Sequence, residues 1–167
     1  MFSGKAFVVT VKVKVDAFLS ALDFGSERLI SFHQATRQSI GAVLEKANPV
    51  KTREVWDVYQ AIYDARSVNA ATLVDLVRSL PNALSRGETA HCFDRGEAPL
   101  SSGIAYGTII FDDELLVGDP LVEAEKLSEE AARRKALLAI DFDLLPDIYV
   151  GNQVENIGAK RVALFVE

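Results

Sequence analysis

The first residues of the chain alternate between apolar and polar side chains, which is the period of a β-strand. Between residues 5 and 15, Phe7 and the odd-numbered valines fall on one face, whereas Lys12 and Lys14 fall on the other. A period of two in a β-branched run predicts a strand. Because the lysines occupy one side only, we expect that side to meet water, as an exposed sheet face or edge does.

The next long stretch, residues 26–47, changes to a helical period. Its apolar residues recur at intervals of three and four, which gives a helix one apolar face. Ser26 is the expected N-cap, and Asn48-Pro49 is the expected stop. A short helical turn over residues 17–24 is expected to join the strand to this helix.

Two shorter helices are expected in the middle of the chain. The first begins at Thr52 as N-cap and carries apolar residues at helical spacing. The second is capped by Asn69 and ends at Pro81. Residues 82–102 have mixed polarity and no period, so they are predicted to form a loop, and so long a loop is usually functional, mobile or wrongly assigned.

The last third of the chain returns to strands around one more helix. Residues 103–111 read as a strand, and Asp119-Pro120 is a good helix start because proline suits the first helical position. This helix is expected to continue to about residue 139. Short strands are predicted at 147–150 and 161–166.

These elements predict an α+β fold, in which a small mixed or antiparallel sheet packs against the long helix and additional shorter helices. A length of 167 residues is usual for one domain, so residues 1–167 are expected to form a single domain. The net charge of −6 argues against sequence-specific nucleic-acid binding, which needs a basic surface. No apolar run is long enough to cross a membrane, and the single cysteine excludes an intrachain disulfide, so a cytosolic protein is expected.

Few residues of the chain offer catalytic chemistry. His91 and Cys92 are adjacent, with Asp94 nearby, but no second pair follows at metal-ligand spacing, and His33 is the only other histidine. No glycine-rich phosphate loop or nucleophile motif is present. We therefore expect no catalytic residues, no metal and no cofactor, and a protein that is not an enzyme.

Two acidic runs and the single tryptophan can each be interpreted either as a functional feature or as an ordinary structural one. Residues 112–114 and the aspartates of 141–147 could hold a hard cation, but neither run has the calcium-loop pattern, so solvated turns are the preferred interpretation. Trp56, the lone tryptophan, is expected to fill the core, with an interface anchor as the alternative.

Two parts of the chain carry a recurring pattern. A predicted helix runs into Asn48-Pro49-Val50-Lys51-Thr52 with a tryptophan just beyond, and the chain ends in a strand that follows a Tyr-Val-Gly-Asn segment. This pattern resembles the tail-completion and neck proteins of tailed bacteriophages, the family that includes lambda-type minor tail protein Z. The matching positions are Pro49, Val50, Thr52, Trp56, Tyr149, Asn152, Ala163 and Glu167. Lys51 and Arg53 depart from the family's Asp and Gly, and the resemblance leaves the middle of the chain uncovered.

The resemblance implies a structural virion protein of the head–tail junction. Such a protein acts by assembling into a ring, here a hexamer matched to the tail tube, with neck and tail-tube proteins as neighbours. A ring needs two different complementary surfaces. The candidate interface residues are Lys12, Lys14, Asp112, Asp113 and Glu114. Two alternatives stay open: a small cytosolic binding or regulatory module that acts as a homodimer, and an enzyme that holds a metal in its acidic turns.

Overall fold

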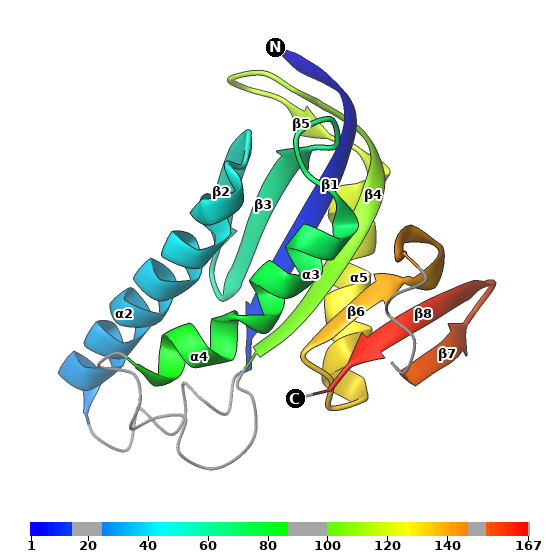
Figure 1. The fold of residues 1–167 in the computed structure, drawn as a ribbon. Coiled ribbons are helices and arrows are strands. Elements are labelled where there is room, and N and C mark those ends of the chain that lie inside the picture. The colour runs from blue at the N-terminus through cyan, green and yellow to red at the C-terminus, as the bar shows by residue number, and fades with distance from the viewer. Residues whose placement is uncertain (15–24, 87–99, 147–152, 167) are drawn as a thin grey trace.

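The computed structural model describes residues 1–14, 25–86, 100–146 and 153–166. Within these ranges, eight strands form one sheet, seven of them in the order β2–β3–β1–β4–β6–β8–β7, with β5 added beside β4 (Figure 1). The strands are β1 Phe2–Val13, β2 Lys51–Val55, β3 Val58–Asp64, β4 Leu100–Phe111, β5 Leu116–Val117, β6 Leu138–Asp141, β7 Gln153–Ile157 and β8 Lys160–Phe165. Strands β4 and β6 run parallel, and the other neighbouring pairs are antiparallel.

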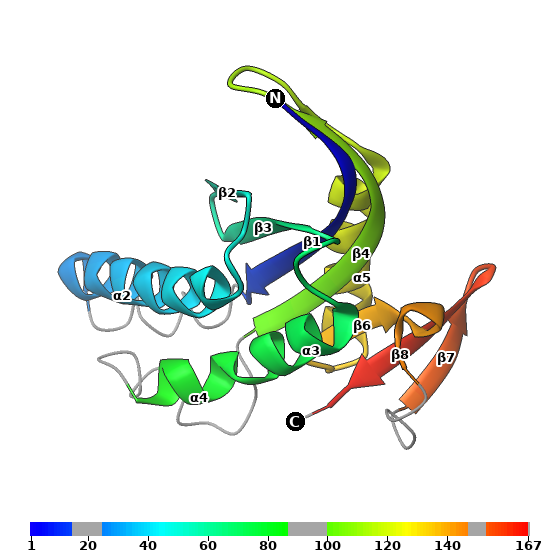
Figure 2. The ribbon, with the colours of Figure 1, turned by 45° about the horizontal axis from the view of Figure 1, so that its top comes forward.

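Helices cover both faces of this sheet. Helices α2 (Ser26–Leu44), α3 (Ala70–Arg78) and α4 (Leu80–Ser85) lie on one face, and α5 (Asp119–Arg133) lies on the other (Figures 1 and 2). Short 3-10 turns, η1 (Glu45–Ala47) and η3 (Phe142–Leu144), follow α2 and β6. The predicted α+β fold, a sheet packed against a long helix and shorter helices, is therefore confirmed.

The central strand β1 feeds two cores because its side chains point alternately to the two faces. Val9 and Val11 are fully buried in one core together with Phe32 and Ile40 of α2. Val8 is fully buried in the other core, on the side of α5. The expected packing of the apolar strand face against the helix at 26–47 is thus confirmed.

Contrary to expectation, the opposite face of β1 does not meet water. Thr10 is fully buried there, and the side chain of Lys12 is only 30% exposed beneath α5. The alternating pattern identified a strand correctly. It could not show that the polar side is covered by a helix, because a buried hydroxyl with a hydrogen-bond partner, as Thr10 has, fits beneath a helix equally well.

Helix α5 lies close against β4 because two glycines remove the side chains between them. A Cβ at Gly103 would stand 2.1 Å from the carbonyl oxygen of Ala124, and a Cβ at Gly107 would stand 2.6 Å from Cγ of Pro120. These glycines therefore set the depth at which α5 packs.

The helix predicted from Thr52 is wrong, because the chain forms the β2–β3 hairpin instead. Val55 pairs with Val58 at its turn. The apolar residues of this stretch fit both periods, and their β-branched and aromatic character favours strands. By contrast, the cap at Asn69 is confirmed, since its side chain accepts a hydrogen bond from the amide of Thr72 at 2.9 Å.

Other boundaries differ from prediction. Gly25, and not Ser26, takes the N-cap position of α2. Helix α5 ends at Arg133 rather than near 139, because Lys135 adopts a positive φ of 54° and turns the chain into β6. The predicted loop at 82–102 contains the end of α4 and the start of β4. The strand predicted at 161–166 is confirmed as β8, whereas the turn at 17–24 and the strand at 147–150 lie outside the described residues.

Candidate functional site

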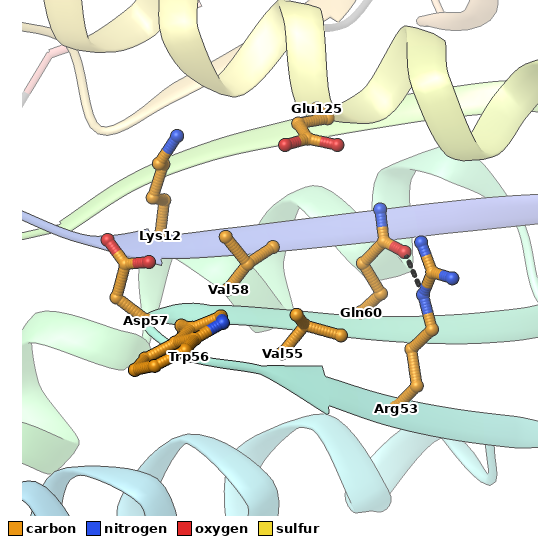
Figure 3. A pocket seen from close by; sticks show the side chains of 8 residues that line it. All are labelled: Lys12, Arg53, Val55, Trp56, Asp57, Val58, Gln60 and Glu125. Atoms are coloured by element: carbon orange, nitrogen blue, oxygen red, sulfur yellow. Dashed lines mark hydrogen bonds between the residues drawn. The ribbon is translucent and has the colours of Figure 1, made fainter.

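A groove of about 500 Å³ lies between the β2–β3 hairpin and α5, on the face of the sheet that α5 partly covers (Figure 3). This volume falls within the ~300–1,000 Å³ that small-molecule sites usually occupy. Strand β1, the hairpin and α5 each contribute side chains. The lining residues are Lys12, Arg53, Val55, Trp56, Asp57, Val58, Gln60 and Glu125.

The hairpin turn presents an unusual residue beside the groove. Trp56 has a φ of 58°, a left-handed conformation that bulky side chains rarely adopt, and it is 86% exposed. The turn is tied to the sheet because the amide of Val13 donates a hydrogen bond to the carbonyl of Asp57 at 3.1 Å. The expectation that Trp56 fills the core is therefore wrong. At the rim of the groove its indole ring can instead contact a ligand or another chain.

A buried amide orients the basic residue at the other end of the groove. Gln60 is 1% exposed, and its Nε2 donates to Oγ1 of Thr10 at 3.0 Å and to the carbonyl of Leu121 at 3.1 Å. Its Oε1 accepts a hydrogen bond from Nε of Arg53 at 2.6 Å. Strand β1, helix α5 and the hairpin thus meet at one side chain, which holds the Arg53 guanidinium beside the groove.

Charges of both signs meet in this groove. Lys12 and Asp57 lie at one end, Arg53 and Gln60 lie at the other, and Glu125 projects from α5 (Figure 3). Lys12 Nζ lies 3.7 Å from Oε1 of Glu129, whose side chain is 46% exposed, so this ion pair is loose and screened by water. Among the described residues, no carboxylate pairs with Arg53.

The groove does not have the composition of a divalent-metal site. Its carboxylates, Asp57 and Glu125, come from separate elements, and the ammonium group of Lys12 shares the groove with them. Hard cations need several converging oxygen ligands. Across the described ranges, no group of three or more His, Cys, Asp or Glu side chains could hold a metal.

The acidic runs act as turns. Oδ1 of Asp112 accepts hydrogen bonds from the amides of Glu114 and Leu115 at 3.0 and 2.8 Å, and these bonds lower the pKa of the Asp112 carboxyl. Asp141 accepts a similar bond from the amide of Asp143 at 3.0 Å. The preferred interpretation, acids that cap and solvate turns, agrees with these contacts at Asp112 and Asp141, whereas Asp147 lies outside the described residues.

The five candidate interface residues lie at opposite ends of the long β1–β4 pair. Lys12 pairs with Ser101 in the register of β1 and β4, and half-buried Lys14 follows the end of β1. At the other end, the turn of Asp112, Asp113 and Glu114 follows Phe111, which pairs with Phe2. The structure therefore does not bring the two charged groups together, and their interface role stays a prediction. His91 and Cys92 lie outside the described residues.

No protein-family model matches the chain, and no curated protein matches it. Solved structures do. A bacterial light-regulated adenylyl cyclase gives a TM-score of 0.72 at 13% identity over 98% of this chain and 91% of its own. The adenylyl cyclase CyaB from P. aeruginosa gives 0.70 at 12% identity over 100% and 97%. The guanylate cyclase domain of RhGC from Catenaria anguillulae, in complex with GTP, gives 0.69 at 14% identity over 100% of both chains.

These likenesses show that the chain has the fold of nucleotide cyclase domains over its whole length. They overturn the resemblance to phage neck proteins and, with it, the expected structural role, virion location and phage partners. The expectation that the protein is not an enzyme is also wrong, because the solved structures that share its fold are enzymes. Self-association is supported, since one similar structure is a dimeric guanylyl cyclase domain, but a ring is not. No helix in the described part of the chain could span a membrane.

Proposed function

We propose that this chain is a nucleotide-binding domain of the cyclase type, which binds a purine nucleoside triphosphate in the Trp56 groove and works as a dimer. The observation that carries the proposal is the combination of fold and groove. The fold is that of domains solved with GTP and with an ATP analogue, and the groove brings together two cationic side chains and one exposed aromatic ring.

The cations supply what a triphosphate needs. Lys12 is a compact ammonium with three donors, and Arg53 presents a planar guanidinium whose Nε is already held by Gln60. Charge-assisted hydrogen bonds to phosphate oxygens are stronger than neutral ones. Lys12 lies at one end of the groove and Arg53 at the other, so both can contact phosphate groups of a ligand that lies along the groove (Figure 3).

The aromatic ring supplies a surface for the base. Trp56 is held at the rim by the hairpin turn, so its indole is available for stacking without rearrangement of the core. Stacking of a base on an aromatic side chain contributes about 1–3 kcal/mol. A purine offers more stacking area than a pyrimidine, which is the reason for naming a purine ligand.

Cyclisation of the bound triphosphate is a second candidate function, favoured because the similar structures are adenylyl and guanylyl cyclases. In this reaction the ribose 3′ oxygen bonds to the α-phosphorus, the bond from that phosphorus to the pyrophosphate oxygen breaks, and the 3′ hydroxyl proton leaves. In this candidate function Asp57, which lines the groove near Lys12, would accept that proton (Figure 3).

Equilibrium dialysis against labelled GTP and ATP, followed by chromatography of the nucleotides after long incubation, tests both candidates. Saturable retention of either triphosphate is the expected result and supports the binding proposal. A 3′,5′-cyclic product released with pyrophosphate would support cyclisation as well. If neither triphosphate is retained and no product forms, the proposal is overturned. Sedimentation of the same sample checks the dimer.

A further inference from the structure

We infer that the groove binds its triphosphate as the metal-free anion, with Lys12 supplying the positive charge that a divalent cation usually supplies. This inference rests on the proposed function, since it specifies how the same groove recognises phosphate. Proteins that act on nucleoside triphosphates commonly hold the phosphates through Mg²⁺ bound to carboxylates. The residues of this groove do not fit that arrangement.

The first argument is the set of oxygen donors. Asp57 comes from the hairpin turn and Glu125 from α5, and the two carboxylates lie at different places along the groove (Figure 3). Mg²⁺ demands near-ideal octahedral geometry and few protein ligands, but those ligands must converge. A cation bound at Asp57 would also lie beside Lys12, and two like charges repel in a partly enclosed groove.

The second argument is that, within the described part of the chain, the Lys12 ammonium makes one loose ion pair and no direct hydrogen bond. The 3.7 Å separation between Lys12 Nζ and Glu129 exceeds the range of a direct hydrogen bond. Its side chain is nevertheless mostly buried, since it is only 30% exposed and pairs with Glu129 of α5. A triphosphate carries several negative charges and would compete successfully with one half-exposed carboxylate for this ammonium.

The third argument concerns placement. Lys12 is the last lysine within β1, and the main chain just after it is bonded to the turn that carries Trp56 through Val13 and Asp57. A ligand whose base stacks on Trp56 therefore has its phosphates within the part of the groove that Lys12 lines. Arg53, held by Gln60, contributes the second positive charge.

The test is to measure binding of GTP and ATP by equilibrium dialysis in excess EDTA and again in millimolar magnesium. We expect affinity in EDTA to equal or exceed that in magnesium, because Mg²⁺ neutralises the charge that Lys12 and Arg53 recognise. Lys12→Met should weaken binding in EDTA about tenfold or more, the size expected for loss of a charge-assisted contact. Lys126→Met, which removes the same charge from an exposed site on α5, is the matched control and should change little.

The outcomes separate this inference from the proposed function. Triphosphate binding that tightens more than about threefold with magnesium, or that is unaffected by Lys12→Met, overturns the inference and leaves the proposed function standing. Absence of binding under both conditions overturns the proposed function itself. Lys12→Asp gives a further check: triphosphate binding as tight as wild type in EDTA would show that Lys12 is not the phosphate contact.

Discussion

The buried amide of Gln60 accepts a hydrogen bond from Nε of Arg53 at 2.6 Å while donating two bonds of its own, to Thr10 and to the backbone of Leu121. One side chain thus joins the hairpin, β1 and α5, the three elements that line the groove. Replacing it tests whether this junction stabilises the fold.

Gln60→Leu should lower the free energy of unfolding by about 1–3 kcal/mol, because the carbonyl of Leu121 and the hydroxyl of Thr10 lose a buried partner. Arg53→Met removes an exposed donor, which water in the groove can replace at Oε1 of Gln60, so it should cost less than about 1 kcal/mol. Urea denaturation followed by circular dichroism measures both. Equal losses would show that the junction does not depend on the buried bonds.

Two glycines in different surroundings, Gly103 beneath α5 and Gly41 within α2, provide a second prediction. Gly103→Ala should destabilise the protein by about 1–3 kcal/mol, because the new methyl group would meet the backbone carbonyl of Ala124. Gly41→Ala, within α2, meets nothing within 4 Å and should stabilise by about 0.5–1 kcal/mol through helix propensity. Thermal unfolding of the two variants should therefore shift in opposite directions, and a shared direction would be inconsistent with the packing described.

Two buried tyrosines should respond differently to loss of their hydroxyl groups. The hydroxyl of Tyr63 donates to the carbonyl of Leu44 at 2.7 Å, whereas the buried hydroxyl of Tyr59 has no hydrogen-bond partner among the described residues. Tyr63→Phe should destabilise by about 1 kcal/mol, and Tyr59→Phe should be neutral or stabilising. Denaturant midpoints decide the matter, and a larger loss for Tyr59→Phe would contradict the assignment of partners.

Stability should also fall at alkaline pH. Burial, helped by the charge of Glu54, raises the pKa of Tyr59 from 10.0 to about 12. The folded state therefore holds its proton more tightly than the unfolded state, so this contribution is complete below pH 10 and is lost as pH rises from about 10 to about 12. Urea midpoints measured across that window should fall less steeply for Tyr59→Phe than for wild type. Identical slopes would show that Tyr59 does not contribute.

The sequence predicted the elements whose periodicity is strong and local. The alternation in β1, the apolar stripe of α2 and the proline start of α5 each follow from spacing within one segment, and the structure has all three. The β2–β3 hairpin was missed because its apolar residues also fit a helical period. A closer signal was present, since Val55, Val58 and Tyr59, which surround Trp56-Asp57, are β-branched or aromatic residues that favour strands.

The groove could not be predicted from the sequence by comparable reasoning. Lys12, Gln60 and Glu125 are far apart in the chain, and only the pairing of β1 with β3 and the packing of α5 bring them together. The phage resemblance failed for a related reason. Its matched residues Val50 and Trp56 lie in or beside a hairpin, where scattered identities say little about the order of strands in a sheet.

The central claim is that a nucleoside triphosphate binds beside Trp56, and the fluorescence of this residue tests it most directly. Because the chain has one tryptophan, its emission reports on the groove alone. Titration with GTP and with ATP should give a saturable change in emission, shifted to about tenfold higher concentration in Lys12→Met. Emission that does not change up to millimolar concentrations of either triphosphate would contradict the account.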